Sequence, residues 1–130
     1  TKTVKKLSRP SKQPKRVEGE LLEPLVIAKK WNPHNYMKKA VKFLLEHACA
    51  ALFLDPGLGK TSITLAALLV LFRRKLISKV LIVAPLRVAG STWPREMQQW
   101  TDFRGLRYVA LHGTKRDQLL HEDADIYIIN

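Results

Sequence analysis

The chain has 130 residues, 46% hydrophobic and 26% charged, a balance typical of a globular core with a charged exterior. This length limits the chain to at most one domain. The 23 lysines and arginines outnumber the 11 acidic residues and leave a net charge of +12. Such a surplus favours a polyanionic partner such as nucleic acid, or an acidic surface, although basic side chains that only maintain solubility are the alternative.

Several classes of protein are excluded by what the chain lacks. Cys49 is the only cysteine and cannot form an internal disulfide, so we expect a reducing compartment: the cytoplasm for a bacterial or phage protein, the nucleus for a eukaryotic one. Cys49 lies beside a predicted strand and is expected to be a small core residue. The four histidines show no ligand spacing, so no zinc site is predicted. The longest apolar run, residues 65–72, is far shorter than the roughly 20 residues that span a bilayer, and no signal peptide opens the chain.

The N-terminal segment is strongly basic. Residues 1–16 contain seven lysines and arginines, two prolines and no acid, which predicts a flexible arm that binds nucleic-acid phosphates or is simply solvated. Residues 17–30 are a transition in which Pro24 argues against one continuous helix. We therefore divide the chain into a basic arm, residues 1–30, and a folded part, residues 31–130.

A helix is predicted to follow the turn-like residues 31–35 and to end near His47, with Asn32 or Asn35 as its N-cap. One face of this helix is predicted to pack on the core because its members recur at helical spacing. They are Tyr36, Ala40, Phe43, Leu44 and His47.

Residues 50–61 carry the clearest chemical signal. The apolar residues 50–54 predict a buried strand, and a helix is expected from Lys60 to about Arg74. Gly57 and Gly59 between them allow positive φ angles, so the backbone N–H groups form a nest for an anion at the helix N-terminus. This context predicts a phosphate-binding loop in which Lys60 reaches the β- and γ-phosphates and the Thr61 hydroxyl binds Mg²⁺. The strict pattern has glycine six residues before the lysine, where this chain has Leu54, and an ordinary glycine turn is the alternative.

The remaining elements alternate between strands and helices. Strands are expected at residues 79–84, 107–111 and 125–130, a polar turn at 85–92, a helix at 92–100 and a short helix at 115–121. Trp93, Met97 and Trp100 share one face of the helix and are expected in the core. The alternation predicts an α/β fold: an incomplete, parallel, doubly wound RecA-like lobe whose sheet is covered on both faces. Ligands of such sheets collect at the carboxyl ends of the strands.

Residues 52–61 resemble motif I of the superfamily 2 helicases, and most closely that of the SWI/SNF-type branch as phages and bacteria carry it. Three further segments follow in the family's order and spacing. Residues 33–37 resemble the adenine-side motif, residues 81–88 with 93–100 resemble motif Ia and its helix, and residues 111–116 with 127–130 resemble the segment leading to the next motif.

The resemblance implies a DNA-dependent ATPase that uses ATP and Mg²⁺ to move along double-stranded DNA. Residues implied to hold the triphosphate are Asp55, Gly57, Leu58, Gly59, Lys60, Thr61 and Ser62, with Lys60 and Thr61 catalytic and Thr61 on the metal. Tyr36 and Met37 would flank the adenine, while Arg87, Ser91 and Thr92 would contact the DNA backbone without reading bases. No membrane association is implied.

Two departures from the family pattern affect these expectations. The family has glutamine where this chain has Met37, which cannot make paired hydrogen bonds to adenine. The chain also contains no Asp-Glu motif, that is, no Asp followed directly by Glu, and no second lobe with an arginine finger, on which phosphoryl transfer depends. We therefore expect the chain alone to bind nucleotide weakly or not at all, not to hydrolyse it, and to fold poorly. The alternatives are a non-catalytic nucleic-acid-binding fragment and another P-loop DNA motor, such as a restriction or packaging subunit.

Overall fold

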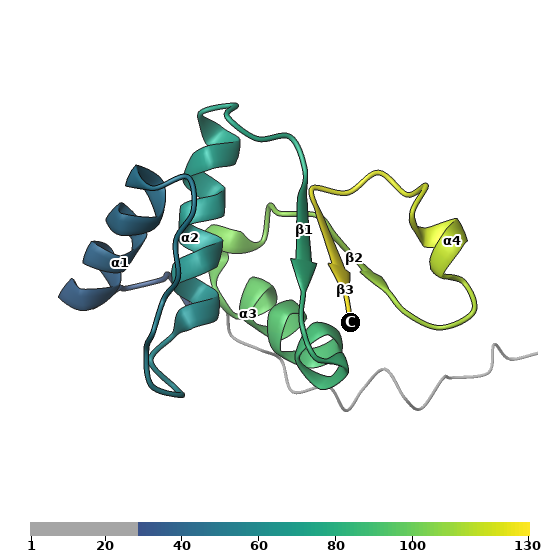
Figure 1. Ribbon diagram of the computed structural model, residues 1–130, viewed down its shortest axis with the longest axis horizontal. Coiled ribbons are helices and arrows are strands. Elements are labelled where there is room, and N and C mark those ends of the chain that lie inside the picture. The colour runs from purple at the N-terminus through teal and green to yellow at the C-terminus, as the bar shows by residue number, and fades with distance from the viewer. Residues whose placement is uncertain (1–28) are drawn as a thin grey trace, which may run out of the picture.

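A computed structural model describes residues 29–130, so the predicted basic arm lies outside the described residues apart from its last two positions. The fold is α/β, as predicted, and Figure 1 shows its helices around a small sheet. The helices and strands are α1 (Asn35–Glu46), α2 (Lys60–Arg73), β1 (Val80–Val83), α3 (Trp93–Gln99), β2 (Tyr108–Leu111), α4 (Arg116–Leu119) and β3 (Ile126–Ile129). No helix within this range is long and apolar enough to cross a membrane.

The three strands form a parallel sheet in the order β1-β3-β2. Ile126 of the central strand β3 pairs with Val80 of β1 on one side and with Tyr108 of β2 on the other. All three carboxyl ends therefore lie at one edge of the sheet. Residues 84–92 and 112–115 leave from that edge, where a ligand of an α/β sheet is expected.

One predicted strand is absent. Residues 50–54 have no regular secondary structure and pair with no strand among the described residues, and Phe53 is 95% exposed. The run leads into α2, which packs against α1, and Figure 1 shows it outside the three-stranded sheet. The prediction of a buried strand was wrong for this structure because an apolar run becomes a strand only where a neighbouring strand accepts its backbone hydrogen bonds.

The core lies on one face of the sheet. Residues from α2, α3, the strands and the 3-10 helical turn Thr101–Phe103 pack there. Among them are Leu65, Ile82, Met97, Phe103 and Ile126, each at most 8% exposed. Trp93 and Trp100 pack against this cluster, which confirms the predicted inward face of α3.

The other face of the sheet is only partly covered. A smaller cluster of Val109, Leu111 and Ala124 packs with Leu119 of α4 over the β2 side. On the β1 side, Leu81 is 63% exposed and Val83 is 73% exposed, beside an open hollow of about 680 Å³. The prediction of a sheet covered on both faces is therefore wrong for β1 in the described residues.

Other local predictions also needed correction. Residues 85–92 are not a polar turn: Leu86 begins a helical turn that continues as a π-helical segment, Val88–Thr92, directly into α3. His34, with no side-chain hydrogen bond, caps α1, in place of Asn32 or Asn35. Cys49 is exposed rather than part of the core.

The inward face of α1 is also rotated from the one predicted. Its partly buried positions are Met37, Ala40, Val41, Leu44 and Leu45, whereas the outward positions include Tyr36, Phe43 and His47. Ala40 and Leu44 were therefore predicted correctly. Val41 packs against the main core cluster and determines which side faces α2.

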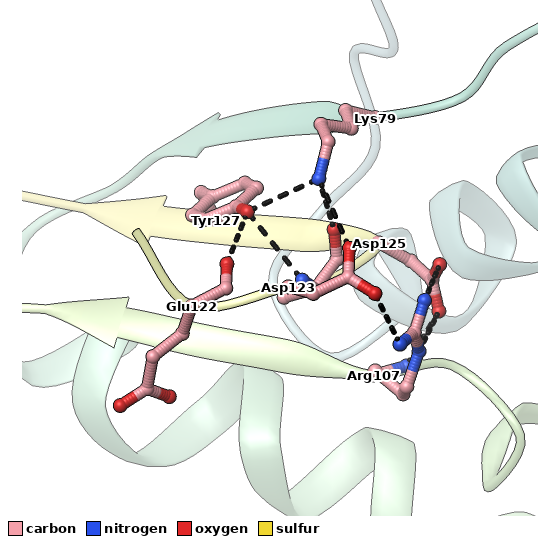
Figure 2. A network of polar contacts seen from close by, with 7 residues as sticks. Lys79, Arg107, Glu122, Asp123, Asp125 and Tyr127 are labelled. Atoms are coloured by element: carbon pink, nitrogen blue, oxygen red, sulfur yellow. Dashed lines mark hydrogen bonds and ion pairs between the residues drawn. The ribbon is translucent and has the colours of Figure 1, made fainter. Parts of the chain in front are cut away.

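A polar network joins the amino ends of the strands (Figure 2). Arg107 donates to Asp125 at 3.1 Å and to Asp123 at 2.9 Å, and Lys79 donates to the Tyr127 hydroxyl at 3.2 Å. Hydrogen bonds from Arg107 lower the pKa of Asp123. Burial raises the pKa of Asp125, but hydrogen bonds from the Arg107 side chain and backbone outweigh this effect and leave that pKa below its ordinary value. The network fixes the register of the strands at the edge opposite their carboxyl ends.

Candidate phosphate-binding site

The loop before α2 has the backbone that its sequence predicts. Gly57 and Gly59 adopt φ angles of 86° and 78°, in the left-handed region that favours glycine. The Leu58 N–H donates to the Asp55 carbonyl at 3.3 Å, which closes the turn, and α2 begins at Lys60. The first N–H groups of this 14-residue helix have no partners within the helix and therefore face the loop with the positive end of its dipole.

The Lys60 side chain folds back over the loop. Its Nζ donates to the Leu54 carbonyl at 2.5 Å and to the Asp55 carbonyl at 3.0 Å. Thr61 beside it is half-buried, and Ser62 is 4% exposed with its hydroxyl donating to the Gly59 carbonyl at 2.9 Å. Ser62 therefore stabilises the loop through this hydrogen bond to its backbone.

Two residues of helix α1 also contact the loop. The Tyr36 hydroxyl donates to the Leu58 carbonyl at 2.9 Å, and the Tyr36 ring stacks on His34 with a 5.9 Å centroid separation. The Met37 methyl lies 2.8 Å from where a Cβ on Gly59 would be. Both residues predicted at the adenine side therefore touch the loop.

A hollow of about 440 Å³ opens between the loop and α3. Its loop side consists of Pro56, Gly57, Gly59, Lys60 and Thr61. Its other side consists of Thr92 at the end of the π-helical segment and Arg95 and Glu96 of α3. The Trp100 indole N–H donates to the Glu96 carboxylate at 2.8 Å and holds it in place.

The residues around the hollow suit a magnesium-bound triphosphate. A Cβ on Gly57 would meet no atom within 4 Å, so packing within the described residues does not explain this glycine, whereas its φ angle and the approach of an anion to the backbone do. Mg²⁺ binds through few protein oxygens, phosphates and waters, so one threonine hydroxyl beside the loop is sufficient. ATP would supply the transferable phosphoryl group, and Mg²⁺ would neutralise its charge.

Of the residues predicted to contact DNA, only Thr92 lines the hollow. Thr92 lines the hollow beside the loop, whereas Arg87 and Ser91 are not among its lining residues. The Ser91 hydroxyl donates to the Arg87 carbonyl at 2.6 Å, and the Arg87 side chain is exposed. The three residues therefore lie on one helical segment, of which only Thr92 reaches the hollow.

Arg95 and Glu96 are site residues that the sequence analysis missed. Thr92, Arg95 and Glu96 have i, i+3, i+4 spacing, which places them on one side of a helix. This pattern could have been noticed, but only a helix that extends back through residue 92 brings it to the loop.

Comparison with known proteins identifies the family of this chain. The family model of the SNF2-related domain matches residues 36–129. The chain belongs to the SNF2-related domain family. The resemblance seen in the sequence is therefore confirmed.

Three individual proteins are similar to the chain. The structure of the Sulfolobus solfataricus SWI2/SNF2 ATPase core in complex with dsDNA matches with a TM-score of 0.66 and 29% identity, over 85% of this chain and 23% of that one. Protein p41 of Acyrthosiphon pisum secondary endosymbiont phage 1 is 31% identical over 106 residues, 78% of this chain. The DNA excision repair protein ERCC-6-like of Bos taurus is 33% identical over 90 residues, 65% of this chain and 7% of that protein. This SNF2-related chain spans about a quarter (23%) of the phage protein.

Proposed function

We propose that this chain is the N-terminal segment of the first lobe of a DNA-dependent ATPase, and that its loop binds the phosphates of ATP with Mg²⁺. The observation that carries the proposal is the hollow at the start of α2, where two left-handed glycines, Lys60 and Thr61 face one space. Membership of the SNF2-related family supports ATP as the ligand. Lys60 would neutralise phosphate charge, and Thr61 would bind the metal.

The DNA part of the proposal concerns the surface at the carboxyl edge of the sheet. Arg87 is exposed on the helical turn after β1, and Ser91 and Thr92 follow it in the same segment. The matched Sulfolobus solfataricus ATPase core was solved with dsDNA, which supports a duplex as the partner. The basic charge of +12 supports backbone contacts of this kind.

Hydrolysis would require groups from outside these 130 residues. These residues contain no Asp followed directly by Glu, the motif that would hold Mg²⁺ and orient water, and we infer that a second lobe supplies an arginine. The division into residues 1–30 as an arm and 31–130 as part of the lobe belongs to the same proposal. The cytoplasm of a bacterial host, or the nucleus of a eukaryotic one, is the compartment where such a motor would meet DNA.

The test is DNA-stimulated ATP hydrolysis by the native protein that carries this chain. Lys60→Ala should lower turnover about 100-fold or more, because one preorganised charge at the reacting phosphate is removed. Lys39→Ala, an exposed lysine of α1, is the matched control and should leave turnover unchanged.

Two results would contradict this proposal. Equal turnover by Lys60→Ala and wild type would exclude the loop from the reaction. Turnover by the isolated 130-residue chain that Lys60→Ala abolishes would contradict the need for a second lobe.

A further inference from the structure

Arg95 stands on the wall of the hollow opposite the phosphate-binding loop. Thr92, Arg95 and Glu96 form this wall, and helix α3, which carries two of them, packs against α2. The hollow therefore has side chains from two elements that are separated in the sequence. A ligand held by the loop would have α3 beside it.

The orientation of Arg95 follows from the core. Met97 is 2% exposed and fixes the inward side of α3. A residue two positions earlier lies about 200° around a helix, on nearly the opposite side. Arg95 is consequently directed away from the core and is exposed, and it lines the hollow rather than the sheet.

Arg95 has no partner within residues 29–130. Its guanidinium makes no hydrogen bond or ion pair there, although Glu96 is its neighbour in the sequence. The Glu96 carboxylate instead accepts the Trp100 indole N–H at 2.8 Å. The planar fork of five N–H donors on Arg95 is therefore available to an anion.

Lys60 and Arg95, the two cationic residues that line the hollow, differ in whether their side chains already have hydrogen-bond partners. Lys60 is already engaged by the carbonyls of Leu54 and Asp55, so it must leave them to reach a phosphate. Arg95 gives up no such bonds within the described residues. An arginine also suits phosphate oxygens better than a lysine does, because it can donate two parallel hydrogen bonds.

We propose that Arg95 is a phosphate-contacting residue supplied by this lobe itself, which binds the triphosphate of ATP from the side opposite Lys60. This inference rests on the proposed function of the loop. It adds a second positive charge to the site and makes α3 part of the nucleotide-binding wall. The helix would then link the phosphate site to the preceding segment with Arg87.

The experiment measures the affinity of the native protein for a fluorescent ATP analogue with Mg²⁺, without DNA. Arg95→Ala should raise the Kd about tenfold or more, as expected for the loss of charge-assisted hydrogen bonds. Arg95→Lys should recover part of this loss, because it keeps the charge without the fork. Arg74→Ala is the matched control at the C-terminal cap of α2, the end remote from the loop, and should bind as wild type.

Three outcomes distinguish failure of the Arg95 inference from failure of the proposed function. If Lys60→Ala weakens binding and Arg95→Ala does not, the role of Arg95 is refuted while the proposed function survives. If the wild-type protein binds no nucleotide, or Lys60→Ala binds as tightly as wild type, the proposed function itself fails. If Arg95→Ala instead weakens binding of duplex DNA in the absence of nucleotide and leaves the Kd for ATP unchanged, Arg95 belongs to the DNA surface and the inference is wrong.

A loss of folding is distinguishable from these results. Arg95 is exposed and has no partner in the described part of the chain, so Arg95→Ala should unfold at the wild-type temperature. A lower unfolding temperature together with weaker binding that Arg95→Lys does not improve would show a structural role and overturn the proposal.

Discussion

Gly57 and Gly59 have similar backbones but different surroundings. Both have φ angles near +80°, where an L-residue is strained by about 1–2 kcal/mol. A Cβ on Gly57 would enter open space, whereas one on Gly59 would meet the Met37 methyl at 2.8 Å and the Ser62 hydroxyl oxygen at 3.1 Å. At Gly57 only the backbone φ angle requires glycine, whereas at Gly59 both the φ angle and the neighbouring side chains require it.

We expect Gly57→Ala and Gly59→Ala each to lower the free energy of unfolding by about 1–2 kcal/mol and to weaken nucleotide binding, because both distort the nest. Gly90→Ala is the control, since Gly90 has no positive φ and no atom within 4 Å of an added Cβ. Urea unfolding and titration with the ATP analogue provide the two readouts. Wild-type stability of both loop variants would show that the loop adopts another backbone in solution.

The sequence was sufficient to predict which residues form the loop, but not which residues of other elements contact it. The glycine spacing and the position of Lys60 were sufficient to predict the turn, since few backbones accommodate them. The contacts of Met37 with Gly59 and the place of Arg95 depend on how α1 and α3 pack, which local patterns do not encode.

Among the elements, the strands were predictable where they have partners. Residues 79–84, 107–111 and 125–130 were expected as strands, and β1, β2 and β3 lie within those bounds. Residues 50–54 have equal apolar content but no pairing strand in the described residues, so they form no regular secondary structure. Residues 85–92 were predicted to be a polar turn, and the helical turn that begins at Leu86 was missed. Ala89, which is 5% exposed, packs this segment against the core.

The network at the amino ends of the strands predicts a pH dependence. The pKa of Asp125 is below its ordinary value in the folded chain, so its ionised form favours folding. This contribution is complete above the unfolded pKa and is lost as the pH falls through the lower folded pKa. Asp125→Asn should therefore cost about 1–2 kcal/mol near pH 7, and less as the pH falls below about 4.

Urea unfolding of wild type and Asp125→Asn from pH 7 to pH 3 checks this expectation. Asp117→Asn is the control, because Asp117 in α4 is exposed and has no ion pair in the described part of the chain. A difference between wild type and Asp125→Asn that stays constant over this range would exclude a role for the ionised carboxylate.

The molecule as a whole is asymmetric about its sheet. One face carries the main core, and the other leaves the β1 side chains Leu81 and Val83 in contact with solvent. Both β1 and β2 are also edge strands. A parallel sheet of this type is usually covered on both faces, so the exposed side of β1 is where further structure of the native protein is expected to pack.

Adjacent residues of β1 test this asymmetry in the 130-residue chain. Ile82→Ala should cost about 2–5 kcal/mol of unfolding free energy, because Ile82 is only 8% exposed. Leu81→Ala should cost less than about 1 kcal/mol, because its side chain is already 63% exposed. Urea unfolding followed by tryptophan fluorescence measures both, and equal losses would mean that the second face is covered in solution.

If the loop binds ATP as proposed, the folded-back Lys60 would affect the exchange of one nucleotide for the next. With Nζ bonded to the Leu54 and Asp55 carbonyls, Lys60 acts as an internal cross-link that holds the ends of the turn together. To bind Lys60, an incoming phosphate would therefore have to replace two existing hydrogen bonds. This replacement would reduce the net free energy gained on binding. The same carbonyls could recapture the lysine when product leaves, so the turn would keep its shape between one nucleotide and the next.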